Sequence, residues 1–233
     1  MSATAMDNVR SATPGQVRRS PSVPAHWPIR RHVAAAETTP AGPLHLVEVT
    51  VPAKTNLTLH VGPAHEEWGG RHALDTIYCA IGVNDVVTAT AKTPGSGFSL
   101  ELSGEHLGDL ASSGSDMRRN HAVLALFAIA RAAGREPDVA LHVDKHIPVG
   151  AGLGGGSADA AATLLAVNTL WGLHWPIERL RDIAATLGAD MPFCLEGGYA
   201  HGTGFGERII PLEDDSSCVQ TLRDRGFAGQ LLV

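Results

Sequence analysis

A glycine-rich segment between a predicted strand and a predicted helix has the residues needed to hold a phosphate group. Residues 148–158 read Pro-Val-Gly-Ala-Gly-Leu-Gly-Gly-Gly-Ser-Ala, so five of these eleven positions are glycine. Glycine lets the backbone turn with positive φ and lets its N–H groups approach an anion closely. The first turn of the following helix adds unsatisfied N–H groups and the positive end of the helix dipole. The segment therefore predicts a phosphate-binding loop, in which Ser157 could cap the helix or contact a phosphate-bound Mg²⁺.

Two better-known glycine loops fit this segment less well. A P-loop needs a lysine directly after its last glycine, whereas Ser157 follows Gly156 here. Residues 150–155 satisfy the G-x-G-x-x-G pattern, but a dinucleotide site also needs an acidic residue on a second strand about 20 positions further on. Glu178, the acidic residue nearest that spacing, lies in the first turn of a predicted helix. A dinucleotide-dependent oxidoreductase is therefore disfavoured, and NADH fluorescence would test it.

Lys54 and Asp190 have the chemistry that phosphorylation of an alcohol requires. Lys54 lies in Pro-Ala-Lys-Thr-Asn at the start of a predicted strand, and Asp190 lies in Gly-Ala-Asp-Met-Pro just after a predicted helix. A carboxylate can accept the proton of an attacking hydroxyl. An ammonium beside it keeps the carboxylate ionised and stabilises charge on the attacking oxygen. Spacing alone does not show whether two residues so far apart in the chain meet.

Composition and charge exclude several other classes of protein. The 233 residues are 44% hydrophobic and 18% charged, which is typical of a globular protein. The net charge of −6 disfavours a general nucleic-acid binder, and no apolar run approaches the roughly 20 residues that span a bilayer. Twelve histidines and three cysteines show no zinc spacing, so we predict neither a protein-held metal nor a disulfide framework. The odd cysteine count favours a reducing, cytoplasmic location.

Hydrophobic periodicity predicts the elements that must position these residues. Alternation predicts strands over 46–51 and 57–61, interrupted by Pro52, and further strands over 86–91, 98–102 and 139–143. Helical spacing predicts helices over 118–133, 157–171 and 176–187. The order of strands, helix, strand, glycine loop and two helices predicts an α/β or α+β arrangement.

The first 44 residues differ from the rest of the chain. They hold five arginines against two acidic residues, and Ser, Thr, Pro and Ala dominate without a sustained period. We therefore predict a flexible basic tail over residues 1–44, followed by the main domain over residues 45–212.

Three segments together resemble the 4-diphosphocytidyl-2-C-methyl-D-erythritol kinases, a family of the GHMP kinase superfamily. They are the Pro-Ala-Lys-Thr-Asn-Leu run from Pro52, the glycine loop with its following Ser-Ala-Asp-Ala-Ala, and Leu-Gly-Ala-Asp-Met-Pro from Leu187. The likeness runs from about Leu46 to Leu212. It implies an N-terminal domain with a fold similar to domain 2 of ribosomal protein S5, and ATP-dependent phosphorylation of the 2-hydroxyl of the cytidylyl substrate in non-mevalonate isoprenoid biosynthesis.

The resemblance also implies roles for individual residues. Lys54 and Asp190 match the catalytic pair, with the aspartate deprotonating the substrate hydroxyl. Asn56, Arg71 and His72 match positions on the substrate side, with His72 expected to help recognise cytosine. The residues that match the ATP side, with Mg²⁺ as the partner of ATP, are Asn120, Lys145, Pro148, Val149, Gly150, Ala151, Gly152, Leu153, Gly154, Gly155, Gly156, Ser157 and Ala158.

The sequence departs from the family pattern in two places. Arg71 stands where the family has an aromatic residue, although a guanidinium can also stack on a base. The family continues into a second domain after the position of Val233, so we expect residues 213–233 to be the start of a C-terminal domain that is largely absent.

Two other readings stay open at this stage. One is an inactive or weakly nucleotide-binding fragment of the same kinase, and the other is a GHMP kinase for a different small alcohol such as mevalonate or homoserine. In each case we expect a small-molecule partner and neither nucleic acid nor membrane. The oligomeric state cannot be read from the sequence.

Overall fold

The computed structural model describes residues 32–36, 44–105, 107, 117–213, 215–222 and 224–225. Within them, the strands are β1 His32–Ala36, β2 Leu46–His65, β3 Arg71–Ala91, β4 Ser99–Gly104, β5 Val139–Lys145, β6 Tyr199–Thr203 and β7 Arg208–Leu212. The helices are α1 His121–Ala133, α2 Gly155–Leu170, α3 Ile177–Leu187, α4 Met191–Glu196 and α5 Ser217–Leu222, with 3-10 turns η1 Glu66–Trp68 and η3 Met117–Arg119.

All seven strands belong to one mixed sheet. The strand order is β1-β2-β3-β5-β4. Off this path, β6 pairs with the first half of β3 and with β7. Every pair is antiparallel except β4 with β5. A dinucleotide-binding fold needs an open, mostly parallel sheet with helices on both faces. The described sheet therefore argues against the oxidoreductase alternative.

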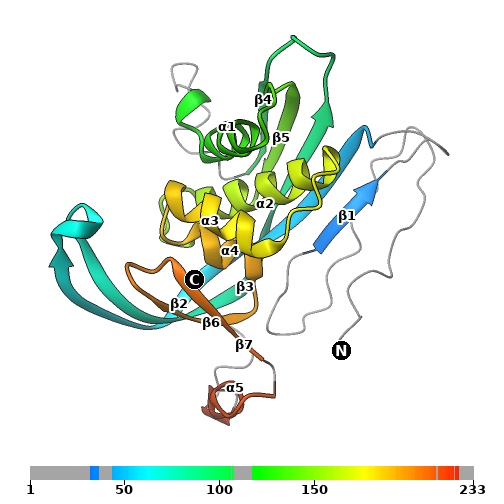
Figure 1. Ribbon diagram of the computed structural model, residues 1–233. Coiled ribbons are helices and arrows are strands. Elements are labelled where there is room, and N and C mark those ends of the chain that lie inside the picture. The colour runs from blue at the N-terminus through cyan, green and yellow to red at the C-terminus, as the bar shows by residue number, and fades with distance from the viewer. Residues whose placement is uncertain are drawn as a thin grey trace.

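Helix α2 forms the centre of the helical layer, between the sheet and the other helices (Figure 1). Eleven of its sixteen residues are buried, and most of these are alanine or another small residue. A helix that is apolar on all sides belongs in a core, and small side chains let it approach β2 and β3 closely. The phosphate-loop helix is therefore fixed by packing along nearly its whole length.

Strand β2 does not break at Pro52, contrary to our prediction. It continues to His65, and its register against β3 shifts between Pro52 and Ala53. Proline is tolerated in a strand at such a bulge because the bulge leaves the ladder locally unpaired. Before the bulge Val47, Val49 and Val51 alternate into the core, and after it Ala53 and Lys54 are both buried. The bulge thus places the lysine inside the fold.

A short strand lies where we predicted a flexible tail. His32–Ala36 forms β1, antiparallel to residues 46–50 of β2. The tail prediction is therefore wrong for these five residues, because a strand this short carries no detectable period and depends on its partner for its stability. Residues 1–31 and 37–43 of the predicted tail lie outside the described part of the chain.

The second half of β2 and the first half of β3 form a long curved arm that reaches away from the helices (Figure 1). Helix α5 lies beyond the base of this arm, where Val219 packs with Cys79 and Tyr199 in a small cluster separate from the main core. Among the described helices, none combines the length and apolarity needed to cross a membrane.

Candidate active site

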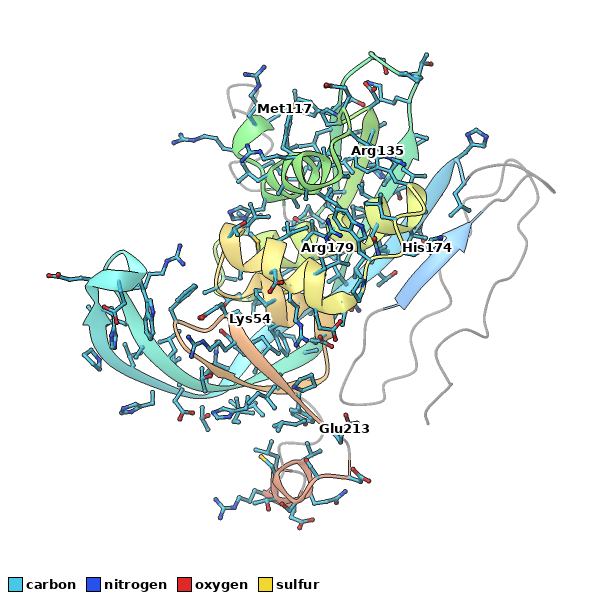
Figure 2. The ribbon with its side chains drawn as sticks, viewed as in Figure 1. Lys54, Met117, Arg135, His174, Arg179 and Glu213 are labelled. Atoms are coloured by element: carbon cyan, nitrogen blue, oxygen red, sulfur yellow. The ribbon has the colours of Figure 1, made fainter. Side chains whose placement is uncertain are left out.

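Lys54 and Asp190 meet. Lys54 lies in β2 just after the bulge, and Asp190 immediately precedes α4; their Nζ and Oδ2 atoms are 2.9 Å apart. The lysine side chain is only 10% exposed, whereas 31% of the aspartate side chain is exposed. Figure 2 shows Lys54 between the helices and the curved arm. The pair is thus anchored on the lysine side and open to a bound molecule on the aspartate side.

Asn56 continues this polar cluster along β2. Lys54 Nζ donates to Asn56 Oδ1 at 3.0 Å, and Asn56 Nδ2 donates to Thr76 Oγ1 at 2.7 Å. The Thr76 hydroxyl in turn donates to the carbonyl oxygen of Thr58 at 2.6 Å. Each of these hydrogen bonds therefore holds the next side chain in place. The series ends on the backbone and directs the lysine ammonium at Asp190.

The glycine loop lies directly beside Lys54. The backbone N–H of Lys54 donates to the carbonyl oxygen of Leu153 at 2.9 Å. Gly150, Gly152 and Gly154 all have φ between +72° and +76°, a conformation that other residues rarely adopt. Gly154 is the residue before the first turn of α2, so the amides of that turn lack intrahelical partners. Ser157 is the third residue of α2 and does not occupy the N-cap position.

The last three glycines of the loop leave no room for a side chain. A Cβ on Gly154 would lie 2.8 Å from Lys54 Cγ, and one on Gly155 would lie 3.2 Å from Lys145 Nζ. A Cβ on Gly156 would lie 2.3 Å from His121 Nδ1. Glycine is thus required here for close packing as well as for backbone conformation.

Lys145 lies next to the glycine loop, with its Nζ 3.2 Å from the position of a Cβ on Gly155. Its ammonium is buried and contacts Asp85 Oδ2 at 2.5 Å and Asp159 Oδ2 at 2.8 Å. Burial lowers the pKa of Lys145, but the charges of the two carboxylates outweigh this and leave that pKa raised. The role of Lys145 on the ATP side stays a prediction, and the structure adds that its ammonium is paired inside the core.

Asp85 and Asp159 were missed by the sequence analysis. Asp85 Oδ1 accepts the backbone N–H groups of His146 and Ile147 at 2.6 and 2.8 Å. Within the described structure, Asp159 Oδ1 is buried with no hydrogen-bond partner. Burial, opposed by Lys145 and assisted by Asp85, raises the pKa of Asp159 to about 7. The signal for Asp159 was its place in Ser-Ala-Asp-Ala-Ala, but helix sequence gives no hint of a partner on β5.

Asn120 caps α1. Its Oδ1 accepts the backbone N–H of Ala122 at 2.9 Å. The next residue, His121, lies against Gly156, and burial together with the charge of Lys145 lowers the pKa of His121. The start of α1 thus lies next to the start of α2, which is where the resemblance put Asn120.

Arg71 and His72 lie at the far end of the curved arm. His72 Nδ1 is 2.9 Å from the carbonyl oxygen of Gly62. The Arg71 guanidinium lies over the ring of Phe205, 4.4 Å from its centroid, and Phe205 meets Trp68 edge to face. Phe205 belongs to the β6–β7 loop and was not predicted as a site residue.

Tyr78 joins the far part of the site to the lysine–aspartate pair. Its hydroxyl donates to Asp190 Oδ1 at 3.0 Å and lies 3.4 Å from the carbonyl oxygen of Gly206, the neighbour of Phe205. Tyr78 was also missed by the sequence analysis, because Tyr78 and Asp190 are 112 positions apart in the chain and leave no local signal.

Comparison with known proteins gives a consistent family. Residues 120–198 match the family described as GHMP kinases N terminal domain. A 4-diphosphocytidyl-2-C-methyl-D-erythritol kinase of Bifidobacterium adolescentis is 74% identical over 190 residues, which cover 82% of this chain and 62% of the relative. One of Bifidobacterium longum subsp. infantis is 75% identical over 187 residues, which cover 80% and 59% respectively. The chain thus spans about 60% of the length of these relatives.

Solved structures agree with these relatives. A crystal structure of 4-(cytidine 5'-diphospho)-2C-methyl-D-erythritol kinase is 37% identical with a TM-score of 0.55, over 71% of this chain and 55% of that chain. A homoserine kinase from Cytophaga hutchinsonii, 18% identical with a TM-score of 0.56 over 76% of this chain and 54% of that chain, shares the fold. Residues 120–198 thus match the N-terminal domain of GHMP kinases, and the chain as a whole is similar to 4-diphosphocytidyl-2-C-methyl-D-erythritol kinases over about 60% of their length.

Proposed function

We propose that this protein transfers the γ-phosphoryl group of ATP to the 2-hydroxyl of 4-diphosphocytidyl-2-C-methyl-D-erythritol, a step of non-mevalonate isoprenoid biosynthesis. The observation that carries the proposal is the 2.9 Å pair of Lys54 and Asp190 beside the glycine loop. The choice of acceptor is supported by the names of the relatives that are 74% and 75% identical.

The glycine loop and the start of α2 would hold the phosphates of ATP. The support is the positive φ of the alternating glycines and the unpartnered amides in the first turn of α2, which point positive charge at an anion. We assign Asn120 and residues 148–158 to this end of the site. Lys145 would contribute its charge from behind the loop, through Gly155, without touching the nucleotide.

The residues present are compatible with Mg²⁺ carried by ATP. Among the described residues, no three His, Cys, Asp or Glu side chains converge on a metal position. Mg²⁺ usually keeps several waters and binds through substrate phosphates and few protein oxygens, so the Ser157 hydroxyl in the first turn of α2 suffices as a protein contact. When bound, Mg²⁺ would neutralise charge on the phosphate oxygens.

Asp190 would act as the general base. It takes the proton of the substrate hydroxyl as that oxygen bonds to the γ-phosphorus and the bond to the ADP oxygen breaks. Each carboxylate oxygen has two lone pairs, so the contacts to Lys54 and Tyr78 leave capacity for the substrate hydroxyl. Lys54 would stabilise the negative charge that develops on the attacking oxygen. Asn56 would keep the ammonium aimed at this point.

The far end of the arm would bind the cytosine. The planar group of Arg71 lies over the ring of Phe205, so it offers a flat cationic surface on which a base could stack. Trp68 borders the same cluster, and His72 lies next to Arg71 on β3. We also propose a cytoplasmic location, consistent with three cysteines that are all free.

ADP release, measured with a panel of acceptors, tests the proposed function. We expect ATP consumption to require the cytidylyl substrate and to exceed that with mevalonate or homoserine by at least the roughly 10²-fold that differential binding commonly gives. Asp182→Asn, on the exposed side of α3, is the control carboxylate. ADP formation that does not depend on an acceptor, or a preference for mevalonate or homoserine, would refute the assignment.

A further inference from the structure

The carboxylate of Asp190 is held away from its nearest local partner. Asp190 is the N-cap residue of α4, a position where aspartate commonly accepts a backbone N–H from the first turn of the helix. Its side chain makes no such capping bond here. The backbone of Asp190 is helical, with φ −81° and ψ −17°, rather than extended as at a usual N-cap, which accounts for the missing capping bond. The contacts that orient the carboxylate are therefore tertiary ones.

Those contacts act on both carboxylate oxygens. Lys54 Nζ lies 2.9 Å from Oδ2, and the Tyr78 hydroxyl donates to Oδ1 at 3.0 Å. A single contact would let the carboxylate rotate about it, whereas two contacts on different oxygens fix both its position and its plane. Tyr78 thus supplies the second of the two restraints.

The surroundings of Tyr78 leave its hydroxyl little freedom. The side chain is fully buried, and its ring stacks on Phe193 with a centroid distance of 4.8 Å and an interplanar angle of 19°. A Cβ on Gly202 would lie 2.4 Å from Tyr78 Cε2, and a Cβ on Gly206 would lie 2.8 Å from the hydroxyl oxygen. The ring is therefore enclosed on two sides by glycines and on a third by an aromatic ring.

The hydroxyl is a donor under all working conditions. Burial, together with the charge of Asp190 and the hydrogen bond to it, raises the pKa of Tyr78 far above its ordinary value. The other acceptor within reach, the carbonyl oxygen of Gly206, lies farther away at 3.4 Å. A protonated phenol next to a carboxylate at 3.0 Å gives its proton to the stronger, charged acceptor.

We propose that Tyr78 is a positioning residue for phosphoryl transfer, which holds the Asp190 carboxylate in the site through Oδ1 while Lys54 holds it through Oδ2. This inference rests on the proposed function for its kinetic consequence, and on geometry alone for its structural one. It adds to the reaction a residue that contacts neither ATP nor the hydroxyl that reacts.

Tyr78→Phe removes only the hydroxyl and keeps the ring stacked on Phe193. We expect kcat to fall about 10-fold while KM for ATP and for the alcohol stays unchanged, because one hydrogen bond to a charged group is lost. The split between a lower kcat and an unchanged KM is the readout of misplacement of the base. A purely structural role would lower the melting temperature and leave kcat per folded molecule unchanged.

Tyr199→Phe is the matched control. Tyr199 is the second tyrosine of the chain, equally buried, but it packs with Cys79 and Val219 away from Asp190. We expect its kcat and its KM values to equal those of the unchanged protein. Equal behaviour of Tyr78→Phe would overturn the proposal.

A second readout works without turnover. The ¹³C signal of the Asp190 side-chain carboxyl, assigned with Asp190→Asn, reports the hydrogen bonds that this carboxyl accepts. We expect its chemical shift at a fixed pH to change in Tyr78→Phe, which lacks the bond to Oδ1, and to stay in place in Tyr199→Phe. An unmoved signal in Tyr78→Phe refutes the role of Tyr78, whereas lack of phosphorylation by the unchanged protein refutes only the proposed function.

Discussion

Two lysine–aspartate clusters lie on opposite sides of the same glycine loop. Lys54 and Asp190 lie at the edge of the fold, with nearly a third of the aspartate side chain exposed. Lys145, Asp85 and Asp159 lie behind the loop, and none of the three side chains is more than 5% exposed. The same residue types thus have two uses. The pair with the open carboxylate can meet a substrate, whereas the buried group can only support the loop.

The difference follows from charge balance. The open pair is one cation with one anion, and water reaches the carboxylate, so its net worth to folding is small. The buried group has two carboxylates for one ammonium, and one carboxylate oxygen of Asp159 has no hydrogen-bond partner within the described structure. Removing the single cation therefore leaves an uncompensated negative charge in the core.

The largest expected effect on stability comes from Lys145→Met. We expect it to lower the free energy of unfolding by about 3–5 kcal/mol, because two buried carboxylates lose their partner. Lys54→Met should cost about 1 kcal/mol or less and abolish phosphorylation instead. Urea denaturation measures both. The double variant Lys145→Met/Asp159→Asn should regain at least about 1 kcal/mol of unfolding free energy relative to Lys145→Met alone. A double-mutant cycle without this coupling would contradict the charge-balance account.

Gly154→Ala tests the link between the loop and the open pair. Its φ of +72° strains any other residue, and the added Cβ would lie 2.8 Å from Lys54 Cγ. We expect kcat to fall on the order of 100-fold, as displacement of a reacting group by about 1 Å commonly does.

Gly134→Ala is the matched control for backbone strain. Gly134 ends α1 with a φ of +61° and has nothing within 4 Å of an added Cβ. Both variants should lose about 1 kcal/mol of stability, but only Gly154→Ala should lose activity. Equal kcat values in the two variants would show that the loop does not position Lys54.

The last expected effect is a change in the pH dependence of stability. The pKa of Asp159 is raised to about 7 in the folded protein by burial and by Asp85. Its contribution to stability is therefore complete below the ordinary aspartate pKa of about 4 and is lost as the pH rises through 7. Asp159→Asn removes this loss, so its urea midpoint should fall less between pH 4.5 and 8. Parallel slopes for the two proteins would contradict the raised pKa.

The sequence predicted the local parts of the fold well. Periodicity and end signals placed helices at 118–133, 157–171 and 176–187, where the structure has His121–Ala133, Gly155–Leu170 and Ile177–Leu187. These signals are local because a helix is made of contacts three and four residues apart. The bulge after Pro52 and the pairing of β1 escaped prediction, because both depend on a partner strand.

The candidate site shows the same division. Sequence motifs picked out Lys54, Asp190 and the glycine loop, and the two side chains do meet. Tyr78 and Asp85 were missed, because their hydrogen-bond partners lie 112 and 60 positions away in the chain. The pairing of Lys145 with two buried carboxylates also escaped prediction, because a sequence does not say which distant side chains a lysine meets.

One measurement tests the central claim most directly, namely transfer of ³²P from γ-labelled ATP to 4-diphosphocytidyl-2-C-methyl-D-erythritol by the unchanged chain and by Asp190→Asn. We predict labelled product from the unchanged chain and a rate lower by about 10²–10⁴-fold from Asp190→Asn, with equal urea midpoints. Transfer by Asp190→Asn at the unchanged rate would contradict the account, as would the absence of labelled product from the unchanged, folded chain.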